Sequence, residues 1–280
     1  MLDSNKLDYD RLSVLTGVLL LALAVMRFLE LPELPILRAT VLGSPIGFDL
    51  SAGSLMILIT LGMSITAVAS MVASHPISME RMVQHGYMFW IVPGMLIMAL
   101  AIWLNDIDDL APWITGIIVS AVLIPISLSV ECRAVDETQR SQQSLGWFQA
   151  SLIYLTAVIF FTLIYDARLR SMLSVSLVAL ISALLSLRLF WITLDNPSAL
   201  LQYSAVTGLI VGQITWGLNY WGLSGMRGGL LLLLVFYLVA GLIQQFLQGE
   251  FNDGQKSRRI LLEYGGLAVA ALLLIVLAVP

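Results

Sequence analysis

Charged residues are scarce in this sequence: Asp, Glu, Lys and Arg make up 11% of its 280 residues, and hydrophobic residues make up 59%. Soluble domains carry about 25% charged and roughly 45–50% apolar residues. A soluble core cannot bury such an excess of apolar side chains, and no long polar stretch offers a separate soluble domain. We therefore predict a single integral membrane domain over residues 1–280.

Cysteine and histidine are almost absent. The single Cys132 excludes an intrachain disulfide framework and a multi-cysteine metal site. His75 and His85, on either side of Arg81, are interpreted as interfacial polar residues, because a metal pair would want a third ligand. We predict no metal and no cofactor. Basic residues are scattered and the net charge is −4, so nucleic acid is not expected as a partner.

The usual catalytic motifs are missing as well. The sequence has no His-Glu-x-x-His pair, no Gly-x-Ser-x-Gly elbow and no phosphate-binding loop. Zinc proteolysis, the common type of serine hydrolysis and nucleotide hydrolysis therefore lack their usual signals. These absences favour a non-enzymatic protein, although membrane enzymes can use scattered residues.

Long apolar runs, in contrast, fill most of the chain. A bilayer core about 30 Å thick requires roughly 20 apolar residues at 1.5 Å of rise each. The fold class we predict is all-α, a polytopic transmembrane helical bundle of about nine spans with no soluble domain. The connections between spans, including Glu30–Asp49, are predicted to be short polar loops. The spans are expected at Leu12–Leu29, Leu50–Val72, Tyr87–Leu104, Ile114–Val130, Trp147–Tyr165, Met172–Leu194, Leu200–Leu223, Gly228–Leu247 and Ile260–Val279.

Lys and Arg are distributed unevenly between the two sets of loops. One side carries Lys6, Arg11, Arg81, Arg133, Arg140, Lys256, Arg258 and Arg259, and the other carries Arg38, Arg168, Arg170 and Arg227. Because Lys and Arg accumulate in cytoplasmic loops, we predict a cytoplasmic amino terminus and an outer carboxyl terminus. The amino-terminal segment is interpreted as a retained signal anchor rather than a cleaved signal peptide.

Several local patterns resemble a known family. They are Leu42-Gly43-Ser44-Pro45, Ile91-Val92-Pro93-Gly94, Leu163-Ile164-Tyr165 followed by Arg168 to Ser171, Thr215-Trp216-Gly217-Leu218-Asn219-Tyr220-Trp221, and Arg258-Arg259-Ile260-Leu261-Leu262-Glu263-Tyr264. These patterns are similar to a family of bacterial multi-spanning membrane proteins defined as a domain of unknown function, and they cover most of the chain. The resemblance implies an all-helical fold in a bacterial cytoplasmic membrane. It implies no activity and no catalytic residues.

An acidic loop on the predicted outer side is a candidate for chemistry. Asn105-Asp106-Ile107-Asp108-Asp109 looks like the first half of the aspartate-rich motif of UbiA-type membrane prenyltransferases, whose carboxylates hold magnesium against a diphosphate. The position where that family has a further aspartate is Trp113, and no second aspartate-rich loop follows. We interpret the segment as a solvated acidic turn.

Two arginines lie inside the predicted spans. A charge such as Arg188 costs at least about 2.5–3.5 kcal/mol at mid-membrane unless it is paired or snorkels. We expect Arg188 to snorkel toward the boundary at Asp195, with pairing to Glu131 as the alternative. Arg27 is expected to pair with Glu30, three residues later on the same helix.

The seventh and eighth spans are the most polar. Buried amides in hydrocarbon need partners, so these side chains are predicted to face the bundle interior. Gly208 and Gly212 form a small-xxx-small pair that allows close approach of another helix. We predict an internal cavity or an interhelical contact centred on Gln213, and hydrogen bonding between helices is the favoured explanation of these amides over a ligand site. The candidate binding residues are Gln213, Trp216, Asn219, Gln244, Gln245 and Arg188.

The function predicted from these features is non-enzymatic. The protein is expected to be a carrier or binder of a small amphipathic or lipid-like molecule, or a structural subunit of a larger membrane assembly. Its expected partners are membrane lipids and, in the second case, other membrane subunits. The alternative is a membrane-embedded, prenyltransferase-like lipid-modifying enzyme that uses Asn105–Asp109.

Overall fold

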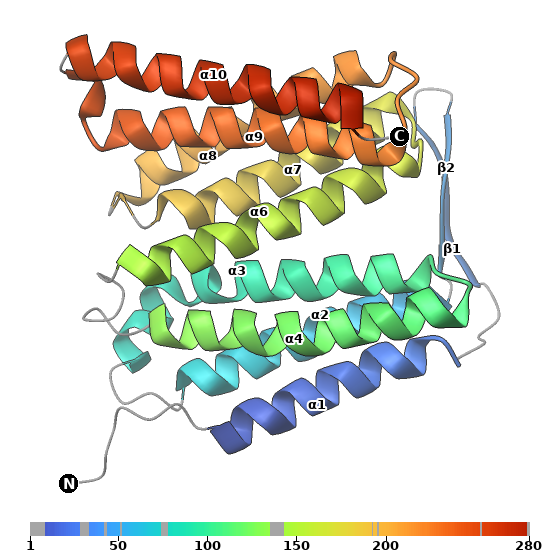
Figure 1. The fold of residues 1–280 in the computed structure, drawn as a ribbon. Helices are drawn as coiled ribbons and strands as arrows, with labels where there is room; N and C mark the ends of the chain where they lie inside the picture. The colour runs from blue at the N-terminus through green and yellow to red at the C-terminus, as the bar shows by residue number, and fades with distance from the viewer. Residues whose placement is uncertain are drawn as a thin grey trace, which may run out of the picture. The chain divides into compact units, whose positions relative to one another are not determined.

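The long apolar segments fold into nine α-helices among the residues that the structure describes (Figure 1). The chain divides into two compact units, Met1–Leu145 and Gly146–Pro280. The computed structural model describes the backbone of residues 9–28, 34–41, 44–50, 52–73, 78–134, 143–191, 193–194, 196–252 and 254–278.

In the described part of the first unit, four helices accompany one β-hairpin. The elements are α1 (Tyr9–Met26), β1 (Leu34–Val41), β2 (Ser44–Leu50), α2 (Ala52–Ala73), α3 (Ser78–Asn105) and α4 (Leu110–Ala134). α3 packs against α1, α2 and α4. Its residues Val92, Leu96 and Leu100 are 0% exposed, and Ile97, on another side of the helix, is 1% exposed. A helix that is apolar all round is stable where neighbours cover it on every side, so α3 forms the core of this unit.

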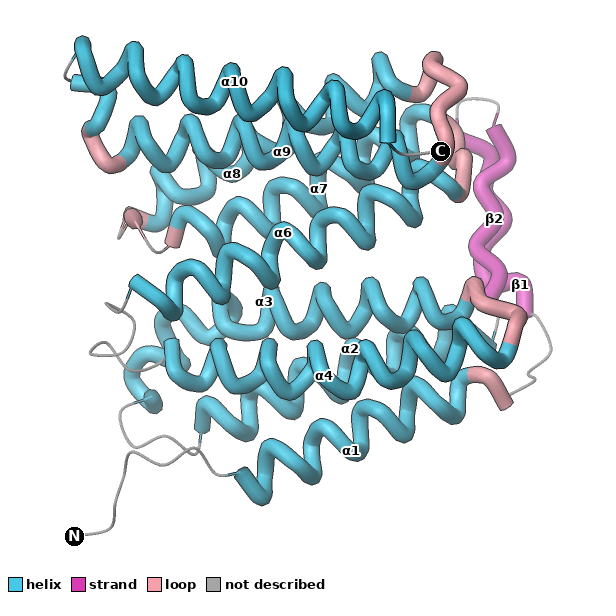
Figure 2. The backbone as a smooth tube through the Cα atoms, in the orientation of Figure 1, coloured by secondary structure: helices cyan, strands magenta, loops and turns pink. Residues whose placement is uncertain are grey.

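The hairpin corrects the loop that was predicted over Glu30–Asp49. β1 and β2 pair antiparallel, with Arg38 opposite Gly47 (Figure 2). The strands have eight and seven residues. The search for span-length apolar runs missed them because such short segments cannot cross a bilayer as helices. The hairpin signal was present: Leu42 and Gly43 alone separate the strands in the sequence, and two-residue connections with glycine favour hairpins.

The described part of the second unit is helical. Its elements are α6 (Gln143–Asp166), α7 (Ser171–Phe190), α8 (Pro197–Leu218), α9 (Gly225–Leu247), the short 3₁₀ helix Glu250–Asn252 and α10 (Gly254–Ala278). α7 packs along α8, α8 packs against α9, and α9 packs against α10. The start of α8 follows from its sequence: the Asn196 side chain accepts a hydrogen bond from the Ser198 N–H at 3.1 Å, and Pro197 occupies the first turn, where no N–H is needed.

Small residues set the close packing of α7 on α8. A Cβ atom added to Gly212 would lie 2.9 Å from the Cβ of Ala179, and one added to Gly208 would lie 2.9 Å from the Cβ of Ala183. Such distances are shorter than van der Waals contact, so the two backbones approach more closely than larger side chains permit. The prediction that the glycine pair allows a neighbouring helix to approach is confirmed.

The predicted helical bundle is confirmed. Each of the nine predicted spans overlaps one helix of the described residues. Three boundaries were wrong: α3 begins at Ser78 rather than near Tyr87, α10 begins at Gly254 rather than near Ile260, and α8 ends at Leu218 rather than near Leu223. The largest difference is at the start of α3. The prediction placed Arg81 and His85 in a loop because they are polar, but the residues of this segment form helices readily and a helix can continue beyond the hydrocarbon. His75 lies outside the described residues.

Five helical segments of the described residues are long and apolar enough to cross a membrane. They are Met88–Asn105, Leu110–Ala134, Leu145–Asp166, Ser171–Phe190 and Gly225–Leu247. Large apolar side chains are exposed along several helices, for example Ile118 at 60% on α4 and Leu180 at 57% on α7. A surface of this kind is costly in water and favourable in lipid.

Candidate binding site around helix α9

Glycines allow α9 to approach α6. A Cβ atom added to Gly229 would lie 2.7 Å from the Cα of Thr162, and one added to Gly228 would overlap the ring of Tyr165. The same device recurs further along α9, where a Cβ atom added to Gly241 would lie 2.5 Å from the ring of Tyr264 on α10. Glycines of α9 therefore leave room for two aromatic rings, those of Tyr165 and Tyr264.

Three tyrosines from three helices meet beside α9. The ring centroids of Tyr154 on α6 and Tyr237 on α9 are 5.4 Å apart, and those of Tyr237 and Tyr264 on α10 are 5.9 Å apart with an interplanar angle of 22°. Phe236 extends the cluster, with its ring centroid 5.8 Å from that of Tyr154. Offset and tilted arrangements at these separations are the favourable geometries for aromatic pairs.

The tyrosines lie near the middle of their helices. Tyr154 is in the central turn of the 24-residue α6, Tyr237 in that of the 23-residue α9, and Tyr264 slightly before the centre of α10. α6 and α9 are among the helices long and apolar enough to cross a membrane. A phenol hydroxyl at the centre of such a helix is far from water, so its hydrogen bonds must come from protein or from a bound molecule. The sequence did not predict this cluster, because one sequence does not reveal which helices are neighbours.

Gln244 and Gln245 connect α9 to two different neighbours. The Gln244 Nε2 donates to the carbonyl of Leu189 on α7 at 3.4 Å. Gln245 hydrogen-bonds Tyr264 on α10. Consecutive helical residues point about 100° apart, which is why adjacent amides reach different helices. The prediction that interhelical hydrogen bonds satisfy these amides is confirmed, and Gln245 extends the tyrosine cluster with an amide.

Arg188 is buried rather than solvated. It is 1% exposed, and its guanidinium carbon lies 4.9 Å from the centroid of the Trp191 ring. The side chain therefore lies toward the end of α7, the direction expected for snorkelling, but it reaches an aromatic face there rather than solvent. The alternative partner, Glu131, belongs to the first unit, and its pairing with Arg188 stays a prediction.

Gln213 does not lie inside the second unit. Its side chain is exposed on α8, and Trp216 is 46% exposed. The buried face of α8 instead includes Gly208, Gly212 and Thr215, spaced three and four apart, together with apolar residues such as Val211. The prediction centred the site on Gln213 because this amide lies well inside an uncharged run, but the glycine pair sets the buried face and Gln213 lies to one side of it.

Asn219 lies in a turn that is held in place by Tyr165 at the end of α6 and by Arg168 just after it. Asn219 caps the carboxyl end of α8, where its backbone N–H donates to the Thr215 carbonyl at 3.0 Å. Tyr165 Oη lies 2.8 Å from the carbonyls of Leu218 and of Trp221, and Arg168 Nη2 donates to the Leu223 carbonyl at 2.9 Å. Two sequence patterns that carry the family resemblance thus meet in space, and their joint role is to hold the turn between α8 and α9.

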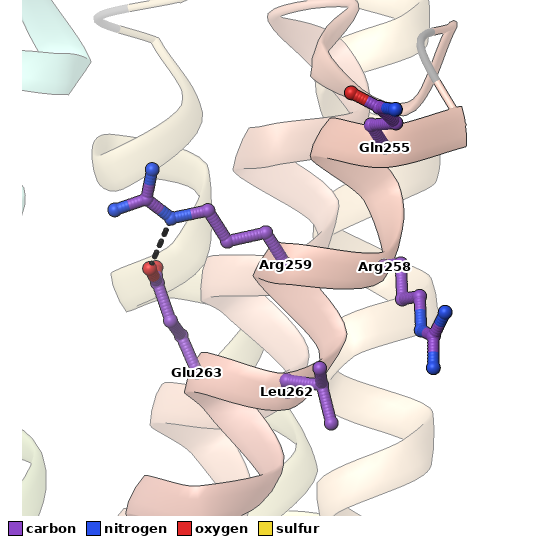
Figure 3. A pocket seen from close by; sticks show the side chains of 5 residues that line it. All are labelled: Gln255, Arg258, Arg259, Leu262 and Glu263. Carbon is purple, nitrogen blue, oxygen red and sulfur yellow. Dashed lines mark hydrogen bonds and ion pairs between the residues drawn. The ribbon is translucent and has the colours of Figure 1, made fainter.

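Two surface regions carry charged side chains. Near the start of α10, a hollow of about 410 Å³ is lined by Arg258, Arg259, Glu263 and two neighbours, and Arg259 Nε bonds Glu263 at 2.8 Å (Figure 3). All of its lining residues come from one helix, so it is an open surface feature. The three aspartates of the acidic loop are exposed, and among the described residues no group of three His, Cys, Asp or Glu side chains could hold a metal ion.

Long apolar helices with exposed apolar faces and polar groups paired between helices define a helical membrane protein. The sequence model of one family, described as a protein of unknown function (DUF5656), matches residues 32–278, and the chain belongs to that family. The predicted resemblance to a family of unknown function is confirmed. No curated protein and no solved structure matches the chain.

Proposed function

We propose that this protein binds a small amphipathic or lipid-like molecule within the membrane, at the cluster of Tyr154, Tyr237, Tyr264 and Gln245. The meeting of three phenols and an amide at the middle of apolar helices carries the proposal. Phenol and amide groups donate hydrogen bonds, and the rings provide flat apolar surface. A ligand that matches both has an apolar body and a carbonyl or hydroxyl group that accepts a hydrogen bond.

Polar groups of this kind are expensive in hydrocarbon when they are unpaired, so each one needs a reason to be there. Gln244 has a sufficient structural reason in its bond to the Leu189 carbonyl. The Tyr264 hydroxyl likewise has a structural reason, in its hydrogen bond with Gln245. Tyr154 and Tyr237 contribute further hydroxyls to the same place, which is more hydrogen-bonding capacity than is needed to join three helices.

The test removes one hydroxyl and keeps its ring. We expect Tyr237→Phe to lose a small molecule that co-purifies with the wild-type protein, measured by mass spectrometry of solvent extracts. The matched control is Tyr203→Phe on α8, whose ring lies 6.4 Å from that of Phe246 and outside the cluster. If the wild type carries no bound molecule across several membrane extracts, or if both variants retain it equally, the proposal is wrong.

We propose further that the protein lies in the bacterial cytoplasmic membrane as a multi-pass protein with its amino terminus in the cytoplasm. The bias of Lys and Arg toward one set of loops supports this orientation. With this orientation the acidic loop between α3 and α4 faces outward.

A further inference from the structure

A polar pocket lies at one end of the first unit, where α1 ends and α3 connects to α4. Its volume is about 280 Å³, and its walls include Arg27, Asn105, Asp108 and Trp113. Most of its surface comes from polar atoms, whereas Leu23 provides part of an apolar side. All of these residues belong to the first unit.

The guanidinium of Arg27 is fixed at the wall of this pocket. Its Nη1 donates to the Ile107 carbonyl at 3.0 Å, its Nη2 donates to the Asp108 carbonyl, and its Cζ lies 5.3 Å from the centroid of the Trp113 ring. The pairing predicted with Glu30 concerns a residue outside the described part of the chain. A guanidinium has five N–H donors in a planar fork, so two carbonyls leave donors to spare and do not neutralise its charge.

Asp108 supplies the opposite charge. Its backbone carbonyl accepts a hydrogen bond from Arg27, and the residue is exposed and lines the pocket. The Asn105 amide, which can both donate and accept, lies in the same wall. The pocket therefore presents a fixed cation, a carboxylate and an amide around one small space.

The pocket lies at the depth of lipid headgroups. The span Met88–Asn105 ends beside it and the span Leu110–Ala134 begins just after it. Because a span crosses the hydrocarbon core, its ends lie at the interface, where Trp and Arg side chains are favourable. Trp113 is 9% exposed and packs edge-on with Phe28, with ring centroids 6.4 Å apart, so an aromatic ring forms this wall of the pocket.

We propose that this pocket binds a phosphoethanolamine group, with the phosphate against Arg27 and the primary ammonium against Asp108. Arginine suits phosphate because its planar donors match phosphate oxygens, and a carboxylate accepts hydrogen bonds from an ammonium. The group can come from a membrane phospholipid or from a free phosphoethanolamine solute. This site is separate from the tyrosine cluster, so either one can fail without the other.

The experiment measures binding of short-chain phosphatidylethanolamine and phosphatidylglycerol to the delipidated, full-length protein in detergent, by native mass spectrometry and titration. The wild type is expected to prefer the ethanolamine lipid, because phosphatidylglycerol has the phosphate without the ammonium. Asp108→Asn keeps the backbone carbonyl that Arg27 binds and removes only the charge. This substitution should lower the affinity for the ethanolamine lipid by about tenfold or more, which corresponds to the loss of one charge-assisted hydrogen bond.

Asp106→Asn is the matched control, because Asp106 is an exposed aspartate of the same loop that does not line the pocket. Asp106→Asn should leave the affinity for both lipids unchanged. Equal affinity of the wild type for the two lipids, or equal effects of the two substitutions, would overturn the proposal. Soluble phosphoethanolamine distinguishes the sources: displacement of the lipid by this solute at comparable concentration identifies a free ligand, and retention of the lipid identifies a membrane lipid.

Discussion

Tyr165, at the end of α6, lies with its hydroxyl 2.8 Å from the carbonyl of Leu218, the last residue of α8. The last carbonyls of a helix have no partner within the helix, and in a membrane protein water cannot always supply one. The same hydroxyl lies 2.8 Å from the Trp221 carbonyl. A phenol has one proton, so the Tyr165 hydroxyl donates to one of these carbonyls at a time. Because both carbonyls lie within hydrogen-bond distance, the hydroxyl can stabilise the turn through either one.

Removal of this hydroxyl should loosen the turn. We expect Tyr165→Phe to lower the free energy of unfolding by about 0.5–1.5 kcal/mol, the usual net value of one hydrogen bond, because the ring still packs against α9. Thermal unfolding in detergent measures the effect. Tyr220→Phe is the control, because Tyr220 belongs to the same turn and is 77% exposed. Equal unfolding temperatures for Tyr165→Phe and wild type would show that the bond contributes no stability.

The helices were predictable because lipid leaves the backbone few alternatives. Every N–H and C=O in the hydrocarbon must be paired, which an apolar run achieves within a single helix, so the spacing of charges located the spans. The spacing of charges did not locate the start of α3. Charged residues mark where a helix leaves the hydrocarbon, but α3 already begins at Ser78, outside the apolar run. The hairpin of β1 and β2 was missed for a related reason, since its pairing partners lie outside any single apolar run.

The candidate site was less predictable because it depends on helix faces and neighbours. Gln213 and Gln244 look alike in the sequence, yet one is exposed on α8 and the other reaches α7. Tyr154 and Tyr264 carried no local signal, since their contact with Tyr237 joins segments far apart in the chain. Glycines were the informative residues: Gly208 and Gly212 identified a buried face from the sequence alone, and Gly241 marks the approach of Tyr264 in the same way.

The two glycines of α8 should therefore be intolerant of larger side chains. Gly212→Val places carbon atoms against Ala179 on α7 and should cost about 1–3 kcal/mol through overpacking. Gly217→Val is the matched control on the same helix, because no atom lies within 4 Å of a Cβ added there. Thermal unfolding in detergent compares the two variants. If they unfold at the same temperature, α7 and α8 are not packed as closely as the structure has them.

Gln244 and Gln213 should differ in their contribution to stability. Gln244→Leu removes the donor to the Leu189 carbonyl and should cost about 0.6–1.7 kcal/mol, the range for hydrogen bonds between membrane helices. Gln213→Leu should leave stability unchanged or raise it, because an exposed leucine is favourable in lipid. Chemical or thermal unfolding in detergent measures both. A larger loss for Gln213→Leu than for Gln244→Leu would restore the original placement of Gln213 inside the bundle.

The two ends of α4 test the proposed orientation. α4 has 25 residues, which at 1.5 Å each span about 37 Å and exceed a hydrocarbon core of about 30 Å. Cys132 lies in the last turn of α4 and Asp109 lies just before its first residue, so the two should face opposite sides of the membrane. Cys132 is partly buried and is the only cysteine of the chain, so any thiol labelling of the wild-type protein reports on this position alone.

With a cytoplasmic amino terminus, a membrane-impermeant maleimide should label Cys132 only after the membrane is opened. The double variant Asp109→Cys with Cys132→Ser should be labelled in intact cells, and Cys132→Ser alone controls for background. A reporter fused after Pro280 should register outside, and one inserted within Asn252–Lys256 should register inside. Because these two positions flank α10, the reverse result at both inverts the proposed orientation, and the same side for both shows that α10 does not cross the membrane.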